Sequence, residues 1–104
     1  MMVYHATPSK NVDSILSQGL LLRCARSGAR RVWFHSFAGR SWSVSHVSKR
    51  HGVERDEVVV MKVHVPDHWL TRFSEVVFWC NRDVPPAHTE SVTWPKRAYR
   101  GPVA

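Results

Sequence analysis

The sequence predicts an α+β domain in which a small, twisted, mixed or antiparallel sheet carries two helices on one side. Three observations lead to this prediction. The segment EVVVMKVHV at 57–65 is apolar and β-branched enough for a central strand. Two amphipathic segments are followed by glycines, Gly19 and Gly52, as helices commonly are. The chain has 104 residues and no internal repeat, so residues 1–104 fit a single domain.

The individual elements follow from hydrophobic spacing and turn residues. Residues 3–20 begin as an apolar strand and continue as a helix that opens at Thr7 and Pro8. A second helix is expected over 37–51, with Ser41 as its cap. The remaining strands are expected at 32–36, 57–65, 75–81 and 88–94, with one helical turn at 67–73. The core should therefore lie within about residues 2–94, and the basic tail 95–104 is expected to be flexible.

The charge of the chain favours polyanionic partners. Fifteen Lys and Arg face eight Asp and Glu, for a net charge of +7, which suits nucleic acid, phosphorylated metabolites or a membrane surface. Arg23, Arg26, Arg30 and Arg31 fall in one segment and could follow a nucleic-acid backbone, although a solvated loop explains them equally well. With neither a leader pattern nor an apolar run of membrane-spanning length, we expect a cytoplasmic protein with no membrane partner.

The histidines do not form a metal-binding pattern. His46 and His51 are five residues apart, and His64 and His68 lie on either side of Pro66, so neither pair can share a helical face. The two cysteines lie outside any C-x-x-C pair. No metal site is expected.

His5 lies at the end of the first expected strand, immediately before the helix. Backbone N–H groups converge at a helix N-terminus and its dipole favours an anion. An imidazole here is therefore placed to hold a phosphate or a ribose. The competing interpretation is a hydrogen-bonded histidine at a strand edge.

The residues around His5 resemble a known superfamily. The run 4–7 (YHAT), Asn11-Val12, Ile15-Leu16 and Gly19-Leu20 is similar to the opening of ADP-ribosyltransferase-like domains, which include poly(ADP-ribose) polymerases, DarT-type toxins and RNA 2'-phosphotransferases. Three later segments resemble further strands of that fold: 31–36 (RVWFHS), 58–66 (VVVMKVHVP) and 84–92 (VPPAHTESV). The resemblance extends over about residues 2–94.

The resemblance implies a split sheet whose cleft binds NAD as a substrate. His5 would hydrogen-bond the nicotinamide-side ribose. Trp33 or Phe34 would stack on nicotinamide, and because strand side chains alternate, only one of the two should face the cleft. Arg31 would bind phosphate through two parallel N–H hydrogen bonds from its guanidinium. The cofactor-binding set also includes Ala6, Thr7, Ser36 and Arg40.

Three residues make up the catalytic set that the resemblance implies. His5 and His35 are two of them, His35 replacing polar groups that relatives carry at the end of the second strand. Glu90 is the third, because a carboxylate near the ribose would orient its 2'-hydroxyl and offset positive charge in the oxocarbenium-like transition state. The 2'-phosphotransferases work without such a carboxylate.

We therefore expect a protein that binds NAD or another ADP-ribose-bearing nucleotide and transfers ADP-ribose to a protein or nucleic acid, like the NAD lobe of a 2'-phosphotransferase. One alternative is a small basic module that binds RNA or DNA without catalysis. Another is a metal-free ribonuclease in which His5 acts with His35 or His88 as general base and acid.

Overall fold

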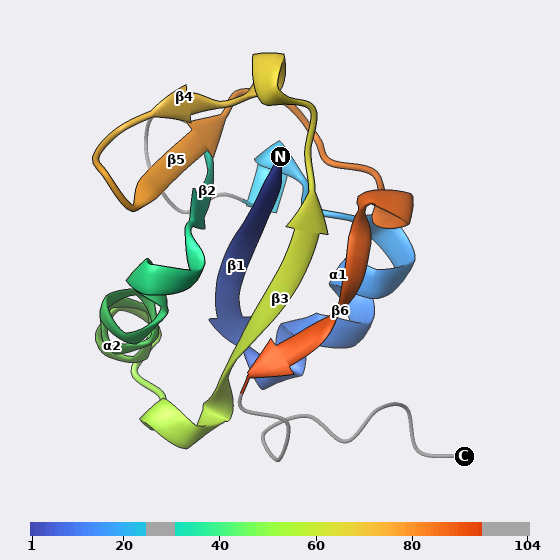
Figure 1. The fold of residues 1–104 in the computed structure, drawn as a ribbon. Coiled ribbons are helices and arrows are strands. Elements are labelled where there is room, and N and C mark those ends of the chain that lie inside the picture. The colour runs from blue at the N-terminus through green and yellow to red at the C-terminus, as the bar shows by residue number, and fades with distance from the viewer. Residues whose placement is uncertain (25–30, 95–104) are drawn as a thin grey trace.

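The computed structural model describes residues 1–24 and 31–94. Figure 1 shows the arrangement of its elements. In chain order, the helices and strands are β1 (Met2–Pro8), α1 (Val12–Gln18), β2 (Val32–His35), α2 (Arg40–His51), β3 (Val58–His64), β4 (Thr71–Arg72), β5 (Val77–Cys80) and β6 (Thr89–Trp94). Short 3₁₀ turns link several of them, including Asp67–Trp69, where a helical turn is predicted.

These residues form an α+β fold with two α-helices and an open six-stranded sheet, which confirms the predicted class. The strand order is β4-β5-β2-β1-β3-β6. Every pairing among the described strands is antiparallel, so the sheet is not mixed. The two-residue strand β4 is not predicted from the sequence, because two exposed residues are too short for any periodic pattern.

The two neighbours of β1 pair with it very differently. Seven consecutive residue pairs, from Met2–His64 to Pro8–Val58, join β1 to β3. Only one pair, Tyr4–His35, joins β1 to β2. Beyond that pair the two strands part, which leaves a gap in the hydrogen-bonded ladder in the middle of the sheet (Figure 1).

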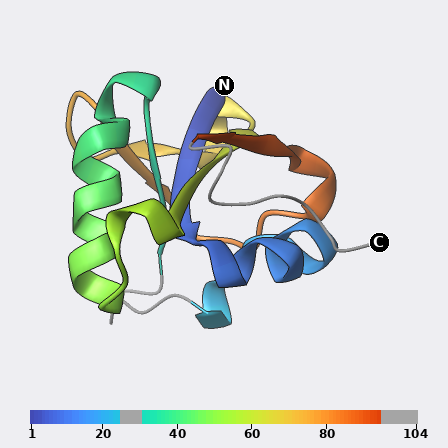
Figure 2. The same cartoon turned by 90° about the horizontal axis from the view of Figure 1, so that it is seen from below.

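The helices lie on opposite faces of the sheet, so the prediction that both cover one side is wrong (Figure 2). Val12 and Ile15 of α1 belong to the larger core, and Val44 of α2 belongs to the smaller one. The reason lies in β3, where one face carries Val59, Met61 and Val63 and the other carries Val58 and Val60, all at most 1% exposed. A strand that is apolar on both faces needs a cover on each.

The first helix starts later than predicted. Thr7 and Pro8 are the last residues of β1, and they pair with Val59 and Val58 of β3. Because these two residues pair within the sheet, they do not cap and open the helix as expected. The helix begins at Val12, after a 3₁₀ turn. The helix ends are as predicted: Gly19 and Gly52 follow α1 and α2 with φ of +85° and +65°.

No helix within the described residues has both the length and the apolar character needed to span a bilayer.

Candidate functional site

A cavity of about 730 Å³ opens where β1 and β2 part. Its walls come mainly from β1, α1, β2 and α2. The rest of the described lining consists of Asn11, Gly19, Leu20, Leu21, Cys24, Arg31, Phe73 and Val77. Since α1 and α2 cover opposite faces, the cavity extends through the gap in the sheet. Its volume lies in the usual range of small-molecule sites.

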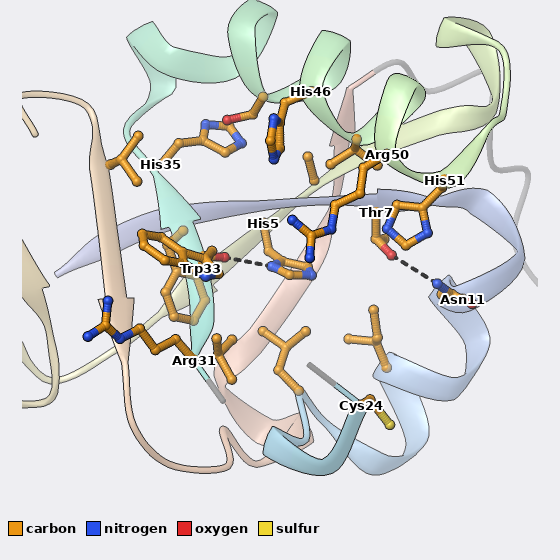
Figure 3. A pocket seen from close by; sticks show the side chains of 18 of the residues that line it. His5, Thr7, Asn11, Cys24, Arg31, Trp33, His35, His46, Arg50 and His51 are labelled. Atoms are coloured by element: carbon orange, nitrogen blue, oxygen red, sulfur yellow. Dashed lines mark hydrogen bonds between the residues drawn. The ribbon is translucent and has the colours of Figure 1, made fainter. Parts of the chain in front are cut away.

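His5 is fixed across this gap. Its Nδ1 lies 2.8 Å from the backbone carbonyl oxygen of Trp33. A carbonyl only accepts, so Nδ1 carries the proton and donates, and Nε2 is left with a free lone pair. The ring also meets Phe34 edge-on, with centroids 6.0 Å apart. The imidazole thus links β1 to β2 where the backbone ladder between them is open (Figure 3).

His5 is neutral at physiological pH. Burial lowers the pKa of its imidazole to about 4, against the opposing effect of the Trp33 hydrogen bond. The like charges of His35 and His51 lower this pKa further. His5 therefore presents a hydrogen-bond acceptor to the cavity rather than a positive charge.

His35 forms an inner part of the wall and is 2% exposed. Its Nδ1 donates to its neighbour's backbone carbonyl, that of Ser36, at 2.8 Å. Its ring stacks on Tyr4 at a centroid distance of 6.0 Å. Burial lowers the pKa of His35 as well, and its Nε2 has no hydrogen-bond partner among the described residues.

The cavity-facing side of α2 adds residues that no sequence motif indicates. Trp42, His46 and Arg50 all line the cavity, and Figure 3 shows Arg50 extending from α2 with its guanidinium turned toward His5. None of the ion pairs found within residues 1–24 and 31–94 involves Arg50. In the sequence, the four-residue spacing of Trp42, His46 and Arg50 is the feature that indicates that they share one side of a helix.

Trp33 and Phe34 both line the cavity, so the prediction that only one of them faces it is wrong. Alternation does put their side chains on opposite faces of β2, but the cavity reaches both faces where the strands part. Trp33 meets Phe73 edge-on at 5.3 Å. Arg31 also lines the cavity, although its guanidinium lies 4.0 Å from the ring centroid of Trp79 and points away from His5 (Figure 3).

The other predicted residues divide into those at the cavity and those outside it. Ala6 and Thr7 line it, and the Thr7 hydroxyl accepts a hydrogen bond from Asn11 at 3.4 Å. The Ser36 carbonyl accepts from His35, and the Ser36 N–H donates to the Val76 carbonyl at 2.9 Å. Arg40 donates to the Phe37 carbonyl at 3.1 Å while covering the Phe37 ring. Neither Ser36 nor Arg40 is part of the cavity wall.

Glu90 also lies outside the cavity. It is on β6, and β3 separates that strand from β1. Its carboxylate is 2.6 Å from His64 Nε2 and 3.9 Å from Lys62 Nζ. The structure therefore does not bring Glu90 together with His5 and His35.

The charge of the wall has one sign. Arg31 and Arg50 contribute cations, and no Asp or Glu belongs to the described lining. Arg26, Arg30 and the tail lie outside the described residues, as does the side chain of Arg23. The part that is described is a cationic cavity with aromatic walls and the neutral imidazoles of His5 and His35, which suits a ligand that carries phosphate and flat rings.

Comparisons of the chain with known protein families and with curated proteins found no match.

Proposed function

We propose that the protein binds NAD or a related ADP-ribose-bearing nucleotide in this cavity. The observation that carries the proposal is the position of His5, whose Nδ1 is held by the Trp33 carbonyl while Nε2 remains an acceptor at the opening between the strands. A ribose hydroxyl is a donor that fits this acceptor. The resemblance of residues 4–20 to ADP-ribosyltransferase-like domains assigns the same role to His5.

The remaining wall residues suit the other parts of such a ligand. Arg50 can pair with a phosphate oxygen without first breaking an ion pair to a described residue. Trp33 offers an aromatic face to nicotinamide. The cavity volume of about 730 Å³ is large enough for a ligand of several rings.

The reaction we propose is transfer of ADP-ribose. The bond between nicotinamide and ribose breaks, and nicotinamide leaves with the bonding pair. An ionised acceptor oxygen, such as a phosphate oxygen, then attacks the cationic ribose carbon, so no proton has to be removed. His5 would position the ribose through its hydroxyl. With no described carboxylate in the wall, the chemistry is closer to that of the RNA 2'-phosphotransferases, which the resemblance includes and which need none.

NAD titration tests the proposal. NAD should shift the amide resonances of His5, Trp33 and Arg50, and His5→Ala should weaken binding by roughly tenfold or more, because one buried hydrogen bond is lost. His68→Ala is the matched control, since His68 is exposed and outside the cavity. Absence of shifts at millimolar NAD in the wild-type protein would contradict the proposal.

A second candidate is binding of single-stranded nucleic acid, which the cavity rim favours. Arg31 stacks on Trp79, Trp33 contacts Phe73, and Phe73 is 66% exposed. Exposed aromatic rings beside unpaired arginines are the usual means of holding bases and backbone together.

Binding of an oligonucleotide at several salt concentrations tests this candidate. Phe73→Ala should weaken binding at all salt concentrations, and Arg31→Ala should also reduce the salt slope by about one. Arg55→Ala controls for charge, because Arg55 contacts Ser45 away from the cavity. Equal losses in Arg31→Ala and Arg55→Ala would argue for nonspecific attraction alone.

The ribonuclease alternative fits the cavity less well. Metal-free RNA cleavage needs one protonated imidazole as the general acid. Burial lowers the pKa values of both His5 and His35, so both rings are neutral near pH 7. His88 lies outside the cavity, where its Nδ1 donates to the His64 carbonyl at 2.7 Å. Neutral rings favour acceptance of hydrogen bonds from a bound ligand.

A further inference from the structure

One stripe of α2 faces the cavity with three different side chains. Trp42, His46 and Arg50 are spaced at four-residue intervals, and all three belong to the wall. At 1.5 Å per residue, the stripe extends about 12 Å along the helix axis. It therefore presents aromatic rings at one end and a cation at the other.

The aromatic end is already arranged for stacking. The rings of Trp42 and His46 are nearly parallel, with an interplanar angle of 9° and centroids 5.1 Å apart. Trp42 is nevertheless 58% exposed. An indole that is fixed by one stacking neighbour and open on its other side is ready to receive a second flat ring.

The cationic end is arranged for an anion. Arg50 extends from the same helix toward His5, as Figure 3 shows. The described part of the wall holds no carboxylate that could neutralise it. A guanidinium in this setting binds a phosphate through two parallel N–H groups.

We propose that Trp42 and His46 form a stacking platform for a heteroaromatic base and that Arg50 binds a phosphate of the same ligand. This inference rests on the proposed function and extends it to residues on α2. The base is either the purine or the pyridine ring of the dinucleotide. Both are flat aromatic rings, and the experiment distinguishes them.

Calorimetric titration with ADP, nicotinamide mononucleotide and inorganic pyrophosphate tests the platform. One of the two nucleotides should stack its base on Trp42, and Trp42→Ala should lower the affinity for that nucleotide by about tenfold. This is the usual contribution of a base–aromatic stack. Trp42→Ala should leave pyrophosphate binding unchanged. Arg50→Ala should lower the affinity for all three probes. Trp42→Phe should recover most of the affinity that Trp42→Ala loses, because it keeps an aromatic face.

Two variants serve as matched controls. Phe37→Ala removes another exposed aromatic residue, and Lys49→Ala removes another cation of α2; neither residue lines the cavity. Both controls should bind every probe as the wild type does. Thermal unfolding of each variant shows whether a lost affinity reflects a lost fold.

The outcomes separate the platform from the proposed function. If the wild type binds NAD and the mononucleotides, and Trp42→Ala binds them equally well, the platform is wrong while the proposed function stands. If Trp42→Ala lowers the affinity for pyrophosphate as strongly as the affinity for the mononucleotides, Trp42 has only a structural role and the platform is again wrong. If NAD does not bind but ADP does, in a Trp42-dependent way, the platform stands without the dinucleotide. If no probe binds, both proposals fail.

Discussion

Gly19→Ala is expected to lower the free energy of unfolding by about 3 kcal/mol or more, a large part of the 5–15 kcal/mol typical of a small domain. Gly19 has φ +85° and ψ −170°, a region that is essentially restricted to glycine and costs other residues about 1–3 kcal/mol. A Cβ here would lie 2.1 Å from the backbone oxygen of Val84. That oxygen accepts a hydrogen bond from Leu20, so it cannot move away without breaking the bridge between the two segments.

Gly52→Ala is the matched control. Gly52 also has a positive φ, of +65°, but a Cβ there would meet nothing within 4 Å. The expected loss is only about 1 kcal/mol, the ordinary cost of a left-handed conformation. Urea denaturation of the two variants measures the difference. Similar losses in both would mean that the contact with Val84 does not restrain the fold.

The Gly19 substitution should also reach the cavity. Gly19 and Leu20 both line it, and the pairing of Leu20 with Val84 fixes that part of the wall. A shifted loop at Gly19 should therefore weaken nucleotide binding, whereas Gly52→Ala should not.

Much of the fold could be predicted because its signals are local. The continuous apolar run of β3 indicated a central strand, and the glycines after both helices marked where those helices end. The same run also contained the signal for a cover on each face, since alternate residues such as Val59 and Val60 are both fully apolar. The sequence of β3 alone thus indicates that the two helices cover opposite faces of the sheet.

The candidate site was harder to predict because it depends on contacts between distant residues. The position of His5 in a strand is a sequence feature, but its bond to the Trp33 carbonyl, 28 residues away, is not. Glu90 has the expected residue type and lies on an expected strand, but the sequence does not specify the strand order, which puts β3 between β6 and β1. The direction of the Arg50 side chain depends on how α2 crosses the sheet, which no local sequence pattern indicates.

Acidification is expected to destabilise the protein through His5. In the unfolded chain the pKa of a histidine is near 6.5, and in the fold burial lowers the pKa of His5 to about 4. Between these values the unfolded chain binds more protons than the fold does, so stability is fully present above about pH 6.5 and is lost as the pH falls toward 4. At 1.36 kcal/mol for each pH unit, the loss approaches about 3 kcal/mol.

His5→Asn isolates this effect. The Asn amide can still donate to the Trp33 carbonyl, but it does not titrate. Urea denaturation at pH 7, 5.5 and 4.5 should therefore show a smaller loss of stability in His5→Asn than in the wild type. Part of the loss should remain, because burial also lowers the pKa of His35. His68→Asn should behave as the wild type does, since His68 is exposed outside the cavity. Parallel losses in His5→Asn and the wild type would show that the His5 ring is not held neutral by burial, and the acceptor role of its Nε2 would lose its basis.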